Sequence, residues 1–312
     1  MLTIVAKRLA LSIPLLLLVS AVTFVLIALL PGDAAQVVAG KNATADQIAQ
    51  TRTQLGLDLP LWRQYTNWLG NAVTGDLGAS LVNRQPVADQ LAGRLGPTLS
   101  LIVGATLVAA IVGVAFGVLG ARGGALGKTV DALAVVGLAV PTFWLGLILV
   151  VLLAVKVNAF PALGYVPLTQ SPSQWMASLV LPVVTLAVPA TAAIAKQTRD
   201  AVADALERPF TRTLRAAGAT ERSILLRHAL KNAAVPVLTV LGLTFVGALS
   251  GAIAIESIFA LPGLGGTAVQ ATASGDIPLI QGVVLFFTVI VIAVNLIVDI
   301  AYGYFNPKVR VS

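Results

Sequence analysis

The chain alternates long apolar runs with short polar segments, and this pattern predicts a bundle of membrane-spanning helices. A helix needs about 20 apolar residues to cross the hydrocarbon core of a bilayer. The uncharged stretch 157–195 is too long for one span, and proline, glycine and serine residues place a loop in its first half. Six spans are predicted, at residues 9–30, 98–121, 132–155, 176–195, 233–255 and 277–300.

The first apolar run has an alternative interpretation as a cleaved signal peptide. Its 22 uncharged residues exceed the usual apolar core of such a peptide, which is about 7–15 residues long. No small-x-small cleavage motif precedes Pro31. We therefore expect a retained helix.

The composition is that of an integral membrane protein. Hydrophobic residues make up 57% of the 312 residues, charged residues only 11%, and the mean hydropathy is +0.93. Soluble domains carry about 25% charged residues. The absence of cysteine excludes disulfides and thiolate metal sites, and a single histidine, His228, leaves little for histidine-based catalysis.

The positive charge predicts the orientation of the chain and not a nucleic-acid partner. The net charge is +7, and 14 of the 20 lysines and arginines lie at the termini or in segments 121–131 and 196–232. Because positive residues mark the cytoplasmic side, both termini are expected in the cytoplasm. Segment 31–97 is then a large extracytoplasmic loop, and its amphipathic stretch Leu59–Leu69 suggests partly helical structure.

Prolines and small residues mark special positions within the spans. Pro182 and Pro189 fall in the fourth span, where they either interrupt a helix that lines a pathway or produce a tolerated kink. Small residues four apart permit close helix contact. Two such pairs occur, Gly113 with Gly117 and Gly247 with Gly251.

Charged residues are confined to the ends of the spans. Ionisable groups inside a membrane are costly and mark candidate functional sites, but groups at the boundaries reach water easily. No carboxylate lies in the middle of a span, which argues against a proton-coupled carrier. The four boundary residues are Asp131, Lys156, Glu256 and Asp299.

Residues Arg122–Thr129 end like a phosphate-binding loop, but the match is incomplete. Arg122 occupies the position of the first required glycine, and the segment joins two membrane helices instead of following a strand. We therefore do not expect this chain to bind ATP.

The segment 196–232 contains eight basic and four acidic residues and is the most informative polar region. Residues 210–217 favour a helix, Gly218 a stop, and Thr220 the start of a second helix. Such a protrusion suits docking into a groove of a partner. The alternative is an amphipathic helix lying on anionic lipid.

Residues Arg212–Pro236 resemble the cytoplasmic EAA loop of the inner-membrane permeases of ABC importers, and more narrowly the first permease subunit of the dipeptide, oligopeptide and nickel group. Gly218 matches the glycine of the loop, and Ala216 and Ala217 match the small residues before it. The sequence departs from the common pattern at Arg212, where sugar-type permeases carry glutamate, and at Leu214, where a small residue is usual.

Short blocks along nearly the whole chain resemble the same family in the same order. They are LLPGD (29–33), LGLDLPLWRQY (55–65), GDLGASL (75–81), Pro86 with Arg94 and Leu95, VPTFWLG (140–146), FPALGY (160–165), LP..TL (181–186), ESIFALPGLG (256–265), DIPLIQG (276–282) and NLIVDIAYGYFNPKVR (295–310).

The resemblance implies an all-α, six-helix type I ABC importer permease in the bacterial inner membrane, with no catalytic activity. Its implied partners are a second permease, one or two P-loop ATPase subunits that bind ATP and Mg, and an external substrate-binding protein. This chain itself is expected to bind no cofactor or metal. Implied substrates are dipeptides and oligopeptides, with nickel, glutathione or another small solute as alternatives.

The resemblance also implies two sets of functional residues. The ATPase-coupling set is Phe210, Arg212, Arg215, Ala216, Ala217, Gly218, Ala219, Glu221 and Arg222. The set expected to line the substrate pathway is Thr142, Phe143, Trp144, Thr185, Thr244, Ser250 and Glu256.

Two other classes of protein fit the sequence less well than the permease. A membrane enzyme needs polar catalytic residues clustered at one depth, and no such cluster is visible in the sequence. A channel or an ATP-independent carrier needs a self-contained pathway with coupling groups inside the spans, and those are missing from the apolar runs.

Overall fold

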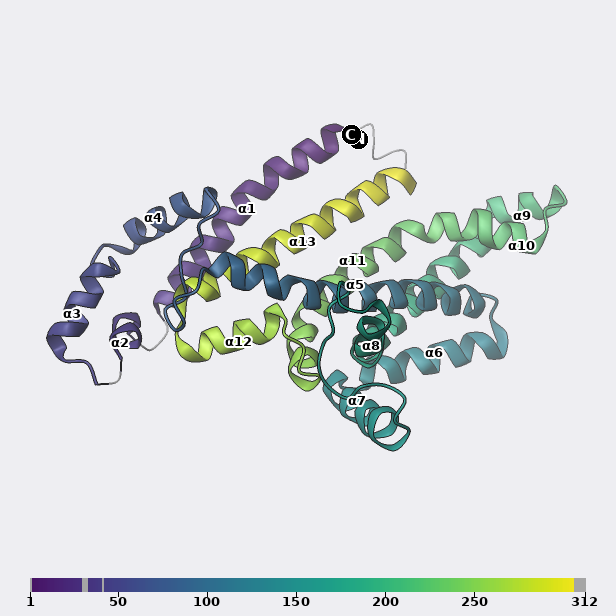
Figure 1. Cartoon of the computed structure of the whole chain (residues 1–312). Helices are drawn as coiled ribbons and strands as arrows, with labels where there is room; N and C mark the ends of the chain where they lie inside the picture. The colour runs from purple at the N-terminus through teal and green to yellow at the C-terminus, as the bar shows by residue number, and fades with distance from the viewer. Residues whose placement is uncertain (1, 30–32, 41, 306–312) are drawn as a thin grey trace. The chain divides into compact units, whose positions relative to one another are not determined.

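The computed structural model describes residues 2–29, 33–40 and 42–305, and these residues are almost entirely helical (Figure 1). Within them the β pairing consists of one isolated antiparallel bridge, between Ala79 and Pro86. The end of the predicted first span at Leu30, the start of the external loop and the C-terminal residues 306–312 lie outside the described ranges. The α-helices are α1 (Leu2–Ala28), α2 (Ala34–Ala39), α3 (Ala45–Gln54), α4 (Leu61–Val73), α5 (Val87–Gly120), α6 (Gly124–Ala139), α7 (Thr142–Leu149), α8 (Pro172–Glu207), α9 (Pro209–Ala216), α10 (Glu221–Ser223), α11 (Leu230–Ile258), α12 (Leu264–Ser274) and α13 (Ile277–Phe305), with π-helical segments η1 (Val150–Lys156) and η2 (Ile224–Ala229).

The chain forms two compact units. The first unit comprises Met1–Val5, Pro97–Leu261 and Ala293–Ser312, and it contains the helices α6 to α11. The second comprises Ala6–Gly96 and Pro262–Ile292, and it contains α2 to α4 and α12. The predicted external loop thus folds into helices, as its amphipathic stretch suggested.

Five helices in the described ranges are long and apolar enough to span a membrane: α1, α5, α8, the α10–η2–α11 helix and α13. A sixth span exists if α6 and the α7–η1 helix are counted as one. These two helices meet at an angle of 96°. The sequence predicted one uninterrupted span over 132–155, and the structure breaks it.

Pro141 explains this break. A proline disfavours helical backbone at the residue before it, and Val140 adopts an extended conformation (φ −75°, ψ 122°). Pro141 then stands directly before the first residue of α7, where its missing N–H removes no helical hydrogen bond. The result is two short helices joined at a corner.

Pro182 and Pro189 have no such effect on α8. Both lie inside this continuous 36-residue helix, so neither ends it. Ser171 caps the start of the helix, because its hydroxyl accepts a hydrogen bond from the backbone N–H of Gln174. The helix limits, Pro172 and Glu207, extend beyond the predicted span into the polar flanks.

Close approach of α5 and α8 organises the first unit. A Cβ atom on Gly113 would lie 2.9 Å from Cβ of Ile194, and one on Gly117 would lie 2.6 Å from the backbone oxygen of Ala195. Only glycine permits backbones this close. The second predicted pair is split: Gly247 has open space where its side chain would be, whereas a Cβ atom on Gly251 would lie 3.0 Å from Cδ1 of Leu186 on α8.

We predict that Gly117→Ala destabilises the purified chain, because the new methyl group overlaps α8. Overpacking of this kind costs about 1–3 kcal/mol. Gly247→Ala is the matched control, and it is expected to be neutral or to stabilise by up to about 1 kcal/mol, since alanine favours helix. Thermal unfolding of both variants in detergent provides the measurement, and equal effects of the two substitutions would contradict this packing.

Candidate functional site

The polar segment between α8 and α11 forms a helix–turn–helix hairpin, which we call the coupling hairpin (residues 209–229). α9 ends in a hydrogen-bonded turn in which Gly218 N–H donates to Arg215 O and Ala219 N–H donates to Leu214 O, both at 3.0 Å. This turn needs a left-handed residue, and Gly218 has φ +81°. Thr220 then caps α10 by accepting a hydrogen bond from Ser223 N–H. The predicted order of a helix, a stop at Gly218 and a second helix starting at Thr220 is confirmed.

A buried hydroxyl fixes the hairpin to the end of α8. Thr211 is fully buried, and its Oγ1 donates to the backbone oxygen of Ala205 at 3.0 Å. Beneath it a buried apolar cluster joins the end of α5 to α8, η2 and α11 in the first unit. The cluster consists of Val118 of α5, Ala121 directly after that helix, Val202 and Ala205 of α8, Leu225 and Ala229 of η2, and Ala233 of α11. The base of the hairpin is therefore well packed.

The tip of the hairpin is exposed to solvent. Of the nine residues predicted to couple to an ATPase, Phe210 and Ala219 are half-buried. The other seven are exposed: Arg212, Arg215, Ala216, Ala217, Gly218, Glu221 and Arg222. A basic, exposed tip on a packed base can bind a partner without losing its own fold.

One ion pair crosses the turn. Arg215 Nε donates to Glu221 Oε1 at 2.6 Å, and Arg215 Nη2 donates to Glu221 Oε2 at 3.1 Å. These hydrogen bonds, with the attraction between the charges, lower the pKa of Glu221 and raise that of Arg215. Both side chains also line a cavity of about 340 Å³ beside α5, together with Arg122 and Leu206. The Arg215 guanidinium is therefore already engaged within the chain.

The predicted pathway residues divide by exposure. Phe143, Trp144 and Ser250 are exposed, and Thr142 and Thr244 are half-buried. Thr185 is completely buried and donates to Leu181 O within its own helix. The structure does bring their helices together, because α7 packs against both α8 and α11.

Glu256 is held inside the first unit and does not reach water. It is 1% exposed, and its Oε1 accepts a hydrogen bond of 2.6 Å from Thr98 Oγ1 of α5. The sequence placed Glu256 at a span boundary where exposure would be easy. The burial instead makes it a link between α5 and α11.

The sequence did not predict two tertiary contacts of the first unit, the ion pairs of Arg199 and the buried hydrogen bond of Thr211. Arg199 of α8 donates to Asp131 of α6 at 2.8 Å and to Asp200 at 3.1 Å. Arg199 and Asp131 are 68 positions apart. The sequence predicts Asp131 at the boundary of a span and Arg199 in the polar segment 196–232. Thr211 gave no sequence signal, because one threonine among charged residues carries no sign of burial. Among the described residues, no group of three or more histidine or acidic side chains could hold a metal ion.

Apolar helices long enough to span a membrane, joined by an exposed polar hairpin, are typical of a membrane transport component. Comparison with known proteins leads to the same class. Residues 113–311 match the family described as binding-protein-dependent transport system inner membrane component. Residues 1–102 match the N-terminal part of the same type of membrane component. The chain belongs to this family.

Similar proteins cover essentially the whole chain. A putative peptide transport system permease protein of Brucella abortus (strain 2308) is 41% identical over 312 residues, which is 99% of each chain. A probable peptide ABC transporter permease protein of Sinorhizobium fredii is 38% identical over 98% of each chain. A glutathione transport system permease protein of Escherichia coli (strain K12) is 39% identical over 99% of each chain.

A solved structure supports the fold. The inward-facing MetNI methionine ABC transporter contains a chain that aligns with a TM-score of 0.55 at 20% identity, covering 69% of this chain and 96% of that one. The chain is thus a permease subunit of a binding-protein-dependent transport system, with an all-helical ABC importer fold. It is a multi-pass protein of the inner membrane, and a transport component works with a binding protein and an ATPase.

We predict that the Glu221 carboxyl titrates below its ordinary pKa of about 4.5. Because its pKa is lowered, the ion pair persists at neutral pH and is lost only as the pH falls through the lowered value. Arg215→Gln should return the titration to the ordinary value, whereas Arg222→Gln should shift it much less. Carbon-13 NMR titration of labelled glutamate measures both, and an unchanged midpoint in Arg215→Gln would refute the ion pair.

Proposed function

We propose that this chain is the non-catalytic permease subunit of an ATP-driven importer of short peptides. The observation that carries the proposal is the coupling hairpin, whose basic exposed tip stands on a buried base. The names of the relatives support the choice of substrate, since two of those described above are peptide permeases. Glutathione is the first alternative, because it is itself a small peptide; nickel or another small solute is the second.

The proposed assembly contains a second homologous permease, one or two ATPase subunits and an external binding protein. The ATPases bind ATP and Mg, and this chain binds neither. Both termini and the coupling hairpin lie on the cytoplasmic side, as the distribution of lysine and arginine favours. This orientation places the helices α2 to α4 on the outer side, where a binding protein approaches.

The hairpin is proposed to transmit movement of the ATPases to the membrane helices. A lever must be stiff at its base, and the Thr211 hydrogen bond with the cluster beneath it provides this stiffness. Movement of α9 then moves α8 and α11 together, because both helices contribute to the cluster. The exposed residues Arg212 and Arg222 present positive charge to acidic groups of an ATPase.

The translocation pathway is proposed to lie between this chain and its partner permease. Ser250 belongs to an exposed face of α11 together with the small residues Gly247, Ala254 and Ser257. Thr142, Phe143, Trp144 and Thr244 add polar and aromatic groups from α7 and α11. Thr185 and Glu256 do not face the pathway directly, since both are buried within the chain. They support it through the packing of α8 and α11.

We predict that Arg212→Glu weakens binding of the ATPase subunits about tenfold or more, because it places like charges opposite each other. ATP-driven peptide uptake in reconstituted liposomes should fall together with the binding of the ATPase subunits. Co-purification of the ATPases and uptake of a labelled dipeptide are the two measurements.

Lys128→Glu serves as the matched control, because it makes the same charge change at an exposed position of α6. It should leave both measurements near the level of the unmodified chain. Normal ATPase binding by Arg212→Glu would show that the tip of the hairpin is not the docking surface.

A further inference from the structure

The helix α4 of the second unit has an apolar face that is wider than its contacts within the described chain. Its leucine, valine, alanine and aromatic side chains all fall on one arc of about 140°, because successive residues of a helix are about 100° apart. The polar side chains and Gly70 occupy the rest of the circumference. The neighbouring helix α3 has no such face, since it carries Asp46 and Arg52 and buries no residue.

Tyr65 fastens α4 to the side of the apolar helix α1. Its hydroxyl shares a hydrogen bond of 2.9 Å with Ser20 Oγ and donates to the backbone oxygen of Leu17 at 3.2 Å. Its ring meets the edge of Phe24 at a centroid distance of 5.6 Å. The two hydroxyls satisfy each other, which permits α4 to pack on α1 in the absence of water.

These contacts lie well inside the span of α1. The span is Val5–Ala28, and Ser20 lies eight positions before the end that leads into the predicted external loop. At 1.5 Å per residue this distance is about 12 Å. Half of the hydrocarbon core of a bilayer measures about 15 Å. Tyr65 therefore holds α4 at the depth of one leaflet, although the sequence predicted an aqueous loop here.

The rest of the apolar arc of α4 is exposed. Trp62 is 63% exposed and Val73 80% exposed. The helix on which α4 packs is itself a lipid-facing element, because only 11% of its most apolar stretch is buried, and Leu18 and Val22 are exposed. The free face of α4 thus continues an apolar surface that already requires a lipid environment.

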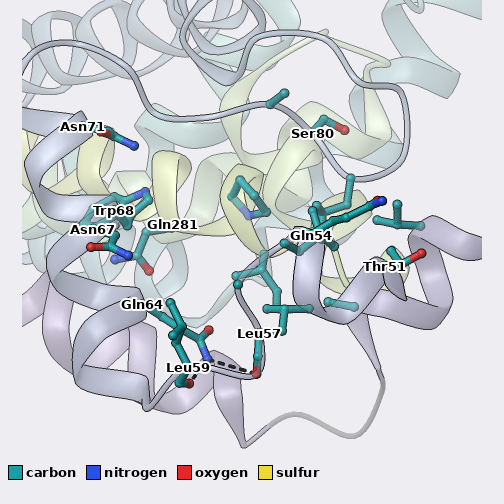
Figure 2. A pocket seen from close by; sticks show the side chains of 18 of the residues that line it. Thr51, Gln54, Leu57, Leu59, Gln64, Asn67, Trp68, Asn71, Ser80 and Gln281 are labelled. Carbon is teal, nitrogen blue, oxygen red and sulfur yellow. Dashed lines mark hydrogen bonds between the residues drawn. The ribbon is translucent and has the colours of Figure 1, made fainter. Parts of the chain in front are cut away.

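The polar arc of α4 faces a different environment. Gln64, Asn67 and Asn71 line a cavity of about 640 Å³ (Figure 2). Arg63 is the single charged residue of α4, and its guanidinium lies over the Trp62 ring at 5.2 Å. Tryptophan is enriched where a membrane meets water, and a long basic side chain can reach lipid phosphates from that level. One apolar face, one polar face and this pair are typical of an interfacial helix.

We propose that α4 lies in the outer interface of the bilayer, with Trp62 and Val73 among lipid acyl chains and Arg63 at the phosphate groups. It anchors the external helices to the membrane surface, so that a binding protein meets them at a fixed height. The choice of the outer leaflet rests on the proposed function and its orientation. The immersion of the apolar face rests on the contacts with α1.

The first test compares two positions on opposite faces of α4. The sequence contains no cysteine, so a single introduced thiol is unique within this chain. Val73→Cys and Asn67→Cys are a matched pair, because both positions are exposed and neither substitution removes a buried side chain. Right-side-out membrane vesicles that contain the whole importer are treated with a membrane-impermeant maleimide polymer, and the mass shift of this chain is followed on a gel.

The thiol at position 73 should react about tenfold more slowly than the thiol at position 67, because lipid shields it from water. Equal rates would overturn the proposal. A fast reaction at position 73 that slows only after addition of the binding protein would overturn it in favour of a docking surface for that protein.

A second measurement identifies what covers the face. A bimane fluorophore on each thiol is exposed, in nanodiscs, to phospholipids that carry a nitroxide on the acyl chain. Quenching should be about twofold or more stronger at position 73 than at position 67. A slow maleimide reaction without such quenching would mean that another protein subunit covers the face, and would overturn the proposal.

Neither measurement uses ATP or peptide, so the anchor and the proposed function can fail separately. Strong quenching at position 73 in a preparation without ATP-driven uptake would support the anchor and refute the proposed transport. Equal reaction rates at the two positions, with normal uptake, would overturn the anchor and leave the importer standing. Reaction of position 67 only in inside-out vesicles would refute the outer placement of α4 and the proposed orientation together.

Discussion

The close contact of α5 with α8 is the constraint on which the first unit depends. Glycines at 113 and 117 let the two helices approach until side-chain and backbone atoms of α8 fill the space of a missing methyl group. The same two helices then supply three members of the buried cluster under the coupling hairpin, Val118, Val202 and Ala205. Since Thr211 ties the hairpin to the end of α8, a push on its tip is passed to a packed group of helices and not to a loose loop.

Much of the fold follows from the sequence because a bilayer imposes simple demands. Long uncharged runs must form helices, since no other conformation satisfies their backbone groups in lipid. The failures have local causes. Pro141 turns the predicted third span into two helices with a 96° bend, whereas Pro182 and Pro189 stay inside one helix. Periodicity does not distinguish these prolines, because all three lie within uncharged apolar runs.

The functional regions are predictable to different degrees. The coupling hairpin is encoded locally, because Gly218 and Thr220 specify its turn and second cap within a few residues. The burial of Glu256 depends on Thr98, 158 positions away, and the ion pair of Arg199 with Asp131 joins residues 68 positions apart. No pattern in a single sequence reports such pairings, since each residue alone looks ordinary. The missed features are tertiary, and the predicted ones are local.

Purification of the tagged chain from native membranes, followed by reconstitution of whatever accompanies it, tests the central claim most directly. The account predicts recovery of a second permease and one or two P-loop ATPases. It also predicts peptide uptake that needs both ATP and the binding protein. Clean recovery of this chain alone, with solute transport in liposomes that requires no ATP, would contradict the account and indicate a self-contained carrier.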